Sequence, residues 1–294
     1  MRKIVALSTL GACLAQLCAP SLPALEFRAE IDASWVENLS RTSFAPSRKS
    51  AAAYAATVTA LQARLLTREW QLFLSGEAGA NWVPKFTGLD SLHGGLHAQL
   101  RRKFGLGPLA PVLDFHGGLT GCAVREGGRS GWQAGAGLTL SRRLTEFWRV
   151  AAGGEWEKYF ASHQAFEVDH RSLSLESTWD LSERWQLGLG ARRLWGQLTA
   201  NARYDIYDTA LDGGFGPAIA NYYNRIPWEI SNTFGPGWVA YRIDCDADFW
   251  WVQLTVTLGP NTSLPLRYET VKVINRVGVR YDTDLWSLGL VHRF

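Results

Sequence analysis

Long apolar runs and an excess of charge of either sign are both missing from this 294-residue sequence. After the first residues there is no run of roughly 18 apolar residues, so no segment is suited to cross a membrane as a helix. The 30 Lys and Arg against 27 Asp and Glu give a formal net charge of only +3. We therefore expect no nucleic-acid partner, because the basic surface that neutralises phosphates is missing.

The chain opens with basic residues followed by an apolar stretch. Arg2 and Lys3 precede that stretch, an arrangement typical of a secretory signal peptide. We predict cleavage after Ala24. The signal peptide would then be residues 1–24, and the mature chain, exported through the Sec pathway, residues 25–294.

Cysteine and methionine are rare, with four residues and one residue respectively. Two of the cysteines belong to the predicted signal peptide, which leaves Cys122 and Cys245 in the mature chain. Export would place them in an oxidising compartment, where disulfides form. Both lie near the ends of predicted strands, but these strands are not neighbours. The sequence therefore leaves a disulfide between them open.

Aromatic residues and glycine are abundant instead, with 14 Trp, 13 Phe, 9 Tyr and 29 Gly. From residue 27 onward, about twelve segments alternate between apolar and polar residues. In the clearest one, 91–101, Leu92 and Leu96 alternate with His93 and His97. Only a strand brings every second residue to the same face, so the alternation predicts strands.

The connections between these segments are of two kinds that follow each other in turn. One set is short: 66–69, 104–109, 141–145, 180–184 and 259–262. The other set is mostly longer: 37–50, 83–90, 124–130, 160–167, 196–238 and 280–284. Short turns on one side and longer loops on the other are typical of membrane-spanning β-barrels. Within the strand predicted at 264–279 the alternation changes phase, which we interpret as a β-bulge.

The last ten residues, 285–294, carry Trp286, Leu288 and Leu290 on one face and end on Phe294. This segment resembles the closing strand of Gram-negative outer-membrane β-barrels, whose C-terminal Phe is read by the barrel-assembly machinery. The resemblance implies that machinery as a partner during biogenesis, and outer-membrane lipid and lipopolysaccharide as surroundings. With the alternation, it predicts an all-β fold: a single closed antiparallel up-and-down transmembrane β-barrel of about 12 strands, as a monomer. The alternative is an amphipathic strand of a soluble β domain.

The tryptophans lie near the predicted strand ends, nearly all on the apolar face. Amphipathic rings favour the membrane–water interface, so we predict two aromatic belts around the barrel. The predicted belt residues are Trp35, Trp70, Trp82, Trp132, Trp148, Trp156, Trp179, Trp185, Trp195, Trp250 and Phe294.

The opposite face of the predicted strands carries charges of both signs. Such residues could form a network of ion pairs that fills the lumen, or they could line a polar pore that screens solutes. The predicted lumen-lining residues are Arg28, Glu30, Asp32, Glu77, His97, Arg101, Asp114, His116, Arg149, Glu155, Glu176 and Arg192.

Histidines offer the one local arrangement that suggests a metal. Folding segment 91–101 onto the next strand is expected to bring His97 opposite His116, with Glu77 and His93 nearby. Imidazoles beside a carboxylate could bind a divalent metal or relay protons. Histidine–carboxylate pairs in a lumen are more often structural, so we predict no metal and no other cofactor.

An enzymatic alternative depends on His170 and Ser172, with Glu176 on the same face. Their His-x-Ser pattern resembles one family of outer-membrane lipid A deacylases, but the Asn-rich continuation of that family is absent. These side chains also share the lumen parity, whereas a lipid hydrolase needs a site that faces the bilayer. The sequence therefore favours a protein that is not an enzyme.

Together these features predict a porin-like outer-membrane barrel, a passive channel or transport-related pore for small polar solutes. Two alternatives remain open: a structural or surface-binding barrel with a plugged lumen, and a lipid-modifying hydrolase. The extracellular loop predicted at 196–238 could fold into the barrel as a constriction or bind a ligand through its aromatic rings. It could equally be a mobile surface loop.

Overall fold

The computed structural model describes residues 25–294, and the predicted signal peptide lies outside this range. Within it, twelve strands form a sheet that closes on itself, and one further short strand pairs with one of them. The twelve strands are β1 (Glu26–Val36), β2 (Ala51–Leu65), β3 (Trp70–Trp82), β4 (Ser91–Lys103), β5 (Val112–Val124), β6 (Gly131–Arg143), β7 (Trp148–Ala161), β8 (Val168–Asp180), β9 (Trp185–Arg203), β11 (Trp238–Gly259), β12 (Thr262–Asn275) and β13 (Arg280–Arg293). The short strand is β10 (Trp228–Ile230), which pairs with β11.

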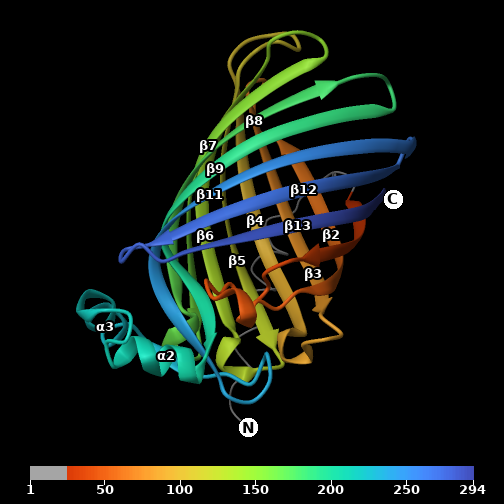
Figure 1. Ribbon diagram of the computed structural model, residues 1–294. Coiled ribbons are helices and arrows are strands. Elements are labelled where there is room, and N and C mark those ends of the chain that lie inside the picture. The colour runs from red at the N-terminus through yellow and green to blue at the C-terminus, as the bar shows by residue number, and fades with distance from the viewer. Residues whose placement is uncertain (1–24) are drawn as a thin grey trace, which may run out of the picture.

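Every strand is antiparallel to its neighbours, and the ring is completed where β9 pairs with β11 and β13 pairs with β1 (Figure 1). The predicted fold class, a closed up-and-down barrel of about twelve strands, is confirmed. Turns of two to eight residues join the strands at one end, which we call the turn end. We call the opposite end, at the bottom of Figure 1, the loop end.

Short helices occur at the loop end. Four are single 3-10 turns: η1 (Ala45–Ser47), η2 (Thr87–Leu89), η3 (Gly127–Arg129) and η4 (Gln164–Phe166). The other two, α2 (Tyr204–Leu211) and α3 (Pro217–Tyr223), lie beside the barrel (Figure 1). No helix in residues 25–294 is long and apolar enough to span a membrane.

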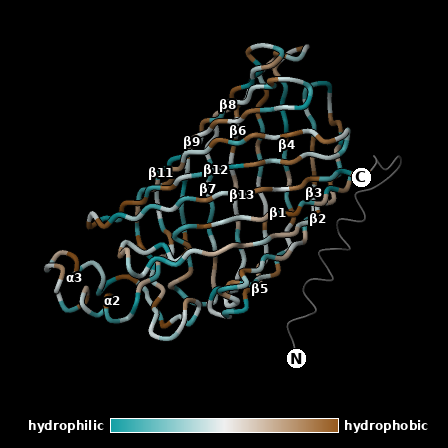
Figure 2. The backbone as a smooth tube through the Cα atoms, turned by 45° about the vertical axis from the view of Figure 1, so that its right-hand side comes forward, coloured by the Kyte–Doolittle hydropathy of each residue, from teal (hydrophilic) through white to brown (hydrophobic). Residues whose placement is uncertain are grey.

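The barrel wall is apolar on its outside. Hydrophobic and hydrophilic residues alternate along the strands in Figure 2, and the apolar set is exposed: Ile31 is 58% exposed, Leu92 65% and Leu175 63%. In water, so much exposed apolar surface would cost about 25 cal/mol per Å². The closed ring also pairs the backbone amides of the wall, as a sheet in hydrocarbon requires. The exterior is therefore suited to contact lipid.

Buried apolar residues gather at the loop end rather than inside the wall. One cluster packs Tyr207 and Tyr223 of the helices against Tyr241 of β11 and Tyr281 of β13. A second cluster joins Ala51, Val83 and Phe86 to Phe234 and Trp238. The packed core of this protein thus fixes the loops and leaves the barrel interior to polar residues.

Three local predictions were wrong. Residues 196–238 are not one loop, because β9 continues to Arg203 and both helices and β10 follow before β11 begins. Residues 280–284 belong to β13, and the turn before it is residues 276–279. No bulge interrupts 264–275, because β12 keeps one register along β11; the only shift in that pairing lies between Thr257 and Gly259.

Candidate functional site

The inner face of the wall is polar and carries ion pairs. Arg101 of β4 contacts Asp114 of β5, with Nε 2.8 Å from Oδ1, and Gln99 donates to the same oxygen at 2.8 Å. Near the start of β1, Arg28 Nη2 lies 2.5 Å from Glu30 Oε2. The strand registers put the predicted lumen residues on this face, opposite the exposed apolar residues. They are Arg28, Glu30, Asp32, Glu77, His97, Arg101, Asp114, His116, Arg149, Glu155, Glu176 and Arg192.

Three lumen carboxylates each contact one imidazole. His97 Nε2 lies 3.2 Å from Glu77 Oε1, and His116 Nε2 lies 3.7 Å from Glu155 Oε1. The third imidazole, His170, has Nε2 2.9 Å from Glu157 Oε2. Of the three pairs, only His170 with Glu157 is hydrogen-bonded, and the other two are close contacts between an imidazole and a carboxylate.

The predicted pairing of His97 with His116 was wrong. His97 lies opposite Gly118, and His116 lies opposite Gln99, because the turn at 104–111 is longer than its sequence pattern suggested. The remaining candidate, His93, approaches Asn81 at 3.4 Å. In residues 25–294 no group of three or more His, Cys, Asp and Glu side chains is arranged to hold a metal ion.

Lumen glycines lie directly beneath these rings. A Cβ on Gly79 would lie 2.6 Å from the His93 ring, and one on Gly137 would lie 2.6 Å from His116 Nε2. His97 covers Gly118 in the same way. Because real Cβ atoms never approach so closely, glycine at these positions lets each imidazole lie against the wall instead of projecting across the lumen.

A cavity of about 380 Å³ lies between the strands β2 to β7, on the lumen side. Its lining includes all three of Glu77, Glu155 and Glu157, and neither Lys nor Arg. His97 and His116 supply the remaining titratable groups. The lining therefore combines three carboxylates with apolar surface from Leu61, Phe73 and Ala98.

The candidate catalytic residues are not assembled into a catalytic group. His170 is bonded to Glu157 rather than to Ser172. Ser172 is 6% exposed, and Glu176 accepts a hydrogen bond from Thr178 at 3.3 Å. Cys122 and Cys245, for which a disulfide was left open, are both free thiols.

At the loop end, residues 196–242 contact the loops of four other hairpins, and we call this segment the cap. Thr199 Oγ1 donates to Ala165 O at 3.2 Å in loop 162–167. The ring of Phe234 packs edge-on against Phe86 of loop 83–90, with 5.0 Å between centroids. Ser231 Oγ donates to Glu126 Oε1 in loop 125–130 at 2.8 Å.

One residue of the cap shows where it lies relative to the lumen. Asn201 Nδ2 donates to Ser40 O in the loop 37–50 at 3.0 Å, and Asn201 Oδ1 accepts from Arg129 Nη2 at 3.2 Å. These contacts join the β1–β2 loop, the β5–β6 loop and β9, which are spaced about a third of the ring apart in the strand order. A residue that reaches all three lies over the mouth of the barrel, so the cap closes the loop end.

Arg129 of loop 125–130 links the cap to the loops beside it. Its Nε donates to Glu126 Oε2 at 2.6 Å, and its guanidinium lies 4.2 Å from the centroid of the Phe166 ring. Burial lowers the pKa of Arg129, although an arginine remains charged. Burial would raise the pKa of Glu126, but hydrogen bonds from Thr233, Arg129 and Ser231 outweigh it and hold that pKa below its usual value.

Of the predicted belt residues, most lie at or near an end of their strand, whereas Trp156, Trp195 and Trp250 lie further along β7, β9 and β11. Trp148 and Trp179 stack at the turn end with 6.1 Å between ring centroids. At the other end, Trp35 is opposite Trp286 in the sheet, and Trp132 stacks on Phe160. The predicted residues that are at least about 37% exposed are Trp35, Trp82, Trp132, Trp156, Trp185, Trp195, Trp250 and Phe294, whereas Trp70, Trp148 and Trp179 are partly buried.

An even-numbered antiparallel barrel with an apolar exterior and a polar lumen defines an integral outer-membrane β-barrel. Neither the models of protein families nor curated protein sequences match this chain. Among solved structures, an outer membrane channel from Pseudomonas putida F1 is similar with a TM-score of 0.60 and 13% identity, covering 94% of this chain and 97% of that one. The NanC porin (TM-score 0.45, 8% identity, 90% and 98% covered) and the KdgM porin (0.41, 10%, 90% and 99%) are also similar. The fold expected from the outer-membrane resemblance is thus confirmed.

Sequence reasoning missed the residues that build the cap. Glu126 and Arg129 flank two glycines, and this stretch was interpreted only as a break between strands. Asn201 fell inside the predicted loop. Residues 197–202 do alternate, with Leu198, Ala200 and Ala202 apolar, but their phase is opposite to that of Leu187 and Leu189. The change of phase near Gly196 therefore made one long strand look like the end of a strand.

Proposed function

We propose that this barrel is a passive channel for small polar solutes, with the loop end facing the exterior of the cell and closed by the cap. The observation that supports it is the 380 Å³ cavity within the lumen, which three glutamates line, between walls whose glycines leave room for the imidazole rings. A barrel that served only as a scaffold would have no need for such space. The likeness to an outer membrane channel at a TM-score of 0.60 agrees with this reading.

A second candidate is a surface-binding barrel with a plugged lumen, and the cap is the one observation that favours it. The two candidates differ in whether the cap can move away from the mouth. The proposal includes export by the signal peptide predicted at 1–24, insertion by the barrel-assembly machinery, a monomeric state and contact with lipopolysaccharide.

The test is single-channel recording of the refolded mature chain in planar bilayers, for the wild type and for Asn201→Ala. The substitution removes the hydrogen bonds to Ser40 and Arg129, each about 1 kcal/mol or more when a charged group takes part. We expect discrete current steps in the wild type and a larger open fraction in the variant. If neither protein gave current steps, the channel proposal would be wrong and the plugged barrel would remain.

A further inference from the structure

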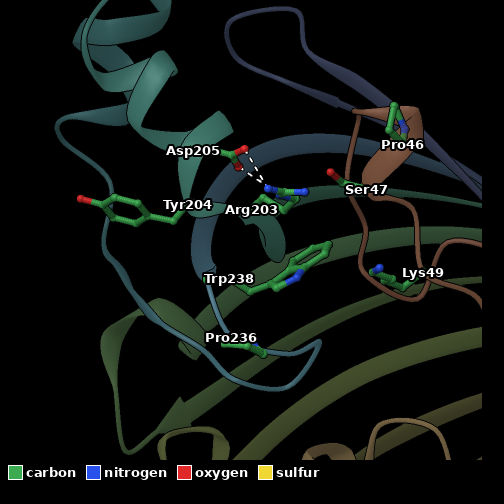
Figure 3. A pocket seen from close by; sticks show the side chains of 9 residues that line it. Pro46, Ser47, Lys49, Arg203, Tyr204, Asp205, Pro236 and Trp238 are labelled. Carbon is green, nitrogen blue, oxygen red and sulfur yellow. Dashed lines mark hydrogen bonds and ion pairs between the residues drawn. The ribbon is translucent and has the colours of Figure 1, made fainter.

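A pocket of about 430 Å³ lies at the seam between loop 37–50 and the cap (Figure 3). Loop 37–50 contributes Ser47 and Lys49, and the cap contributes Arg203, Asp205 and Trp238. Arg203 and Trp238 are opposite each other in the pairing of β9 with β11. The pocket therefore lies at the end of the hairpin that covers the mouth, and two separate segments form its walls.

The charged groups of this pocket leave donors without acceptors. Asp205 accepts from Arg203 Nε at 3.1 Å and from Nη2 at 3.0 Å, which neutralises the carboxylate in the lining. The third guanidinium nitrogen of Arg203 points toward Ser47 in Figure 3. The ammonium of Lys49 lies 5.5 Å from the centroid of the Trp238 ring. The carboxylate of the lining, Asp205, is paired with Arg203 instead.

Ser47 gives an independent indication of a ligand. Its side chain is 1% exposed, and its Oγ has no hydrogen-bond partner among the described residues. In Figure 3 this oxygen is directed toward Arg203. A buried hydroxyl without a partner costs about 1–3 kcal/mol, so the site is incomplete without an acceptor.

We propose that this pocket binds a small oxyanion, a carboxylate or phosphate group, between Lys49, Arg203 and Ser47. Two cations against one paired carboxylate give the lining an excess of one positive charge. Donor nitrogens and a hydroxyl are the groups that recognise such anions. Trp238 and the prolines of the lining provide an apolar wall for the rest of the ligand.

Binding there has a consequence for the cap. The ligand is held by loop 37–50 on one side and by Arg203 of the cap on the other, so it bridges the two. A ligand that binds only the closed arrangement stabilises it in proportion to its concentration over its dissociation constant. At 100 times that constant, opening of the cap is expected to become about 100-fold rarer.

The test is isothermal titration of the refolded mature chain in zwitterionic micelles with inorganic phosphate and with D-glucuronate, and with D-glucose as the uncharged control. We expect the two anions to bind and glucose not to bind. Lys49→Met removes one charged donor and is expected to weaken anion binding about tenfold or more. Lys85→Met is the matched control, because Lys85 also lies over an aromatic ring, Phe86, at 5.4 Å but is outside the pocket.

Vesicles that contain phosphatidylglycerol separate the two sources of the oxyanion. Binding of free anions identifies a dissolved solute, and binding only to the anionic vesicles, lost in Lys49→Met, identifies a lipid headgroup. Absence of both, or binding that Lys49→Met leaves unchanged while the variant keeps the far-ultraviolet spectrum of the wild type, overturns the proposal. Because binding is measured without conduction, this outcome does not depend on whether the barrel is a channel.

Discussion

Replacing Arg129 by methionine is expected to open the cap. The wild-type guanidinium bonds to Glu126 at 2.6 Å and to Asn201 at 3.2 Å, and lies over Phe166. Methionine keeps most of the apolar stem but removes the charge and every donor. Glu126 would remain a carboxylate in a largely enclosed position with only hydroxyl partners.

The magnitude follows from burial. The side chains of Arg129 and Glu126 are 16% and 19% exposed, so the pair is closer to a buried than to a surface ion pair. Removing one partner of a buried pair costs ~3–5 kcal/mol, and partial exposure puts this one near the lower end. A loss of ~3 kcal/mol from the closed state shifts the balance between closed and open caps about 150-fold.

The open fraction in single-channel recordings measures this shift, and hydrogen exchange of the amides at 199–203 measures it without conduction. Arg125→Met is the control, because Arg125 lies in the same loop and pairs with Asp90 at 3.5 Å but is 68% exposed. An exposed pair contributes at most about 1 kcal/mol. Equal behaviour of the two variants in both measurements would refute the role of Arg129.

Three further outcomes are expected. Leu96→Arg places a charge on the lipid-facing side of β4 and should lower the free energy of unfolding in vesicles by ~2–4 kcal/mol, as urea titration measures; an unchanged midpoint would contradict a lipid-facing exterior. Glu155→Gln removes one of the three carboxylates from the lumen cavity. It should reduce the preference for K⁺ over Cl⁻ about threefold in reversal-potential measurements, which is the effect of one charge about 6 Å away in salt solution. Glu176→Gln, which lies outside the cavity, should change this preference less. The pKa of Glu126 is depressed in the folded cap, so its contribution to cap stability is constant above the usual carboxyl pKa of 4.5 and is lost as the pH falls through the folded value. The open fraction should therefore rise only below pH 4.5. A rise already between neutral pH and 4.5 would point to another group.

The barrel wall could be predicted from the sequence because the pattern that forms it is confined to each strand. Lipid on one side and water on the other impose a period of two residues on each strand, and segments such as 91–101 show it without interruption. The register between two strands depends instead on the length of the turn that joins them. With the turn at 104–111, His97 pairs with Gly118 and not with His116. A shift of two residues keeps every side chain on its face, so alternation alone cannot detect it.

The cap could not be predicted, because its contacts join residues that are far apart in the sequence and show no regular spacing. Asn201 meets Ser40 across 161 residues and Arg129 across 72, and each partner belongs to a loop whose own pattern is only polar. The wall beneath it needs no such contacts, because its hydrogen bonds close the ring. We therefore expect the two parts to respond separately: loss of the cap contacts should expose the lumen while the barrel stays intact. The proposed channel requires this separation, and for this reason the cap variants above are expected to change the open fraction without lowering the stability of the barrel itself.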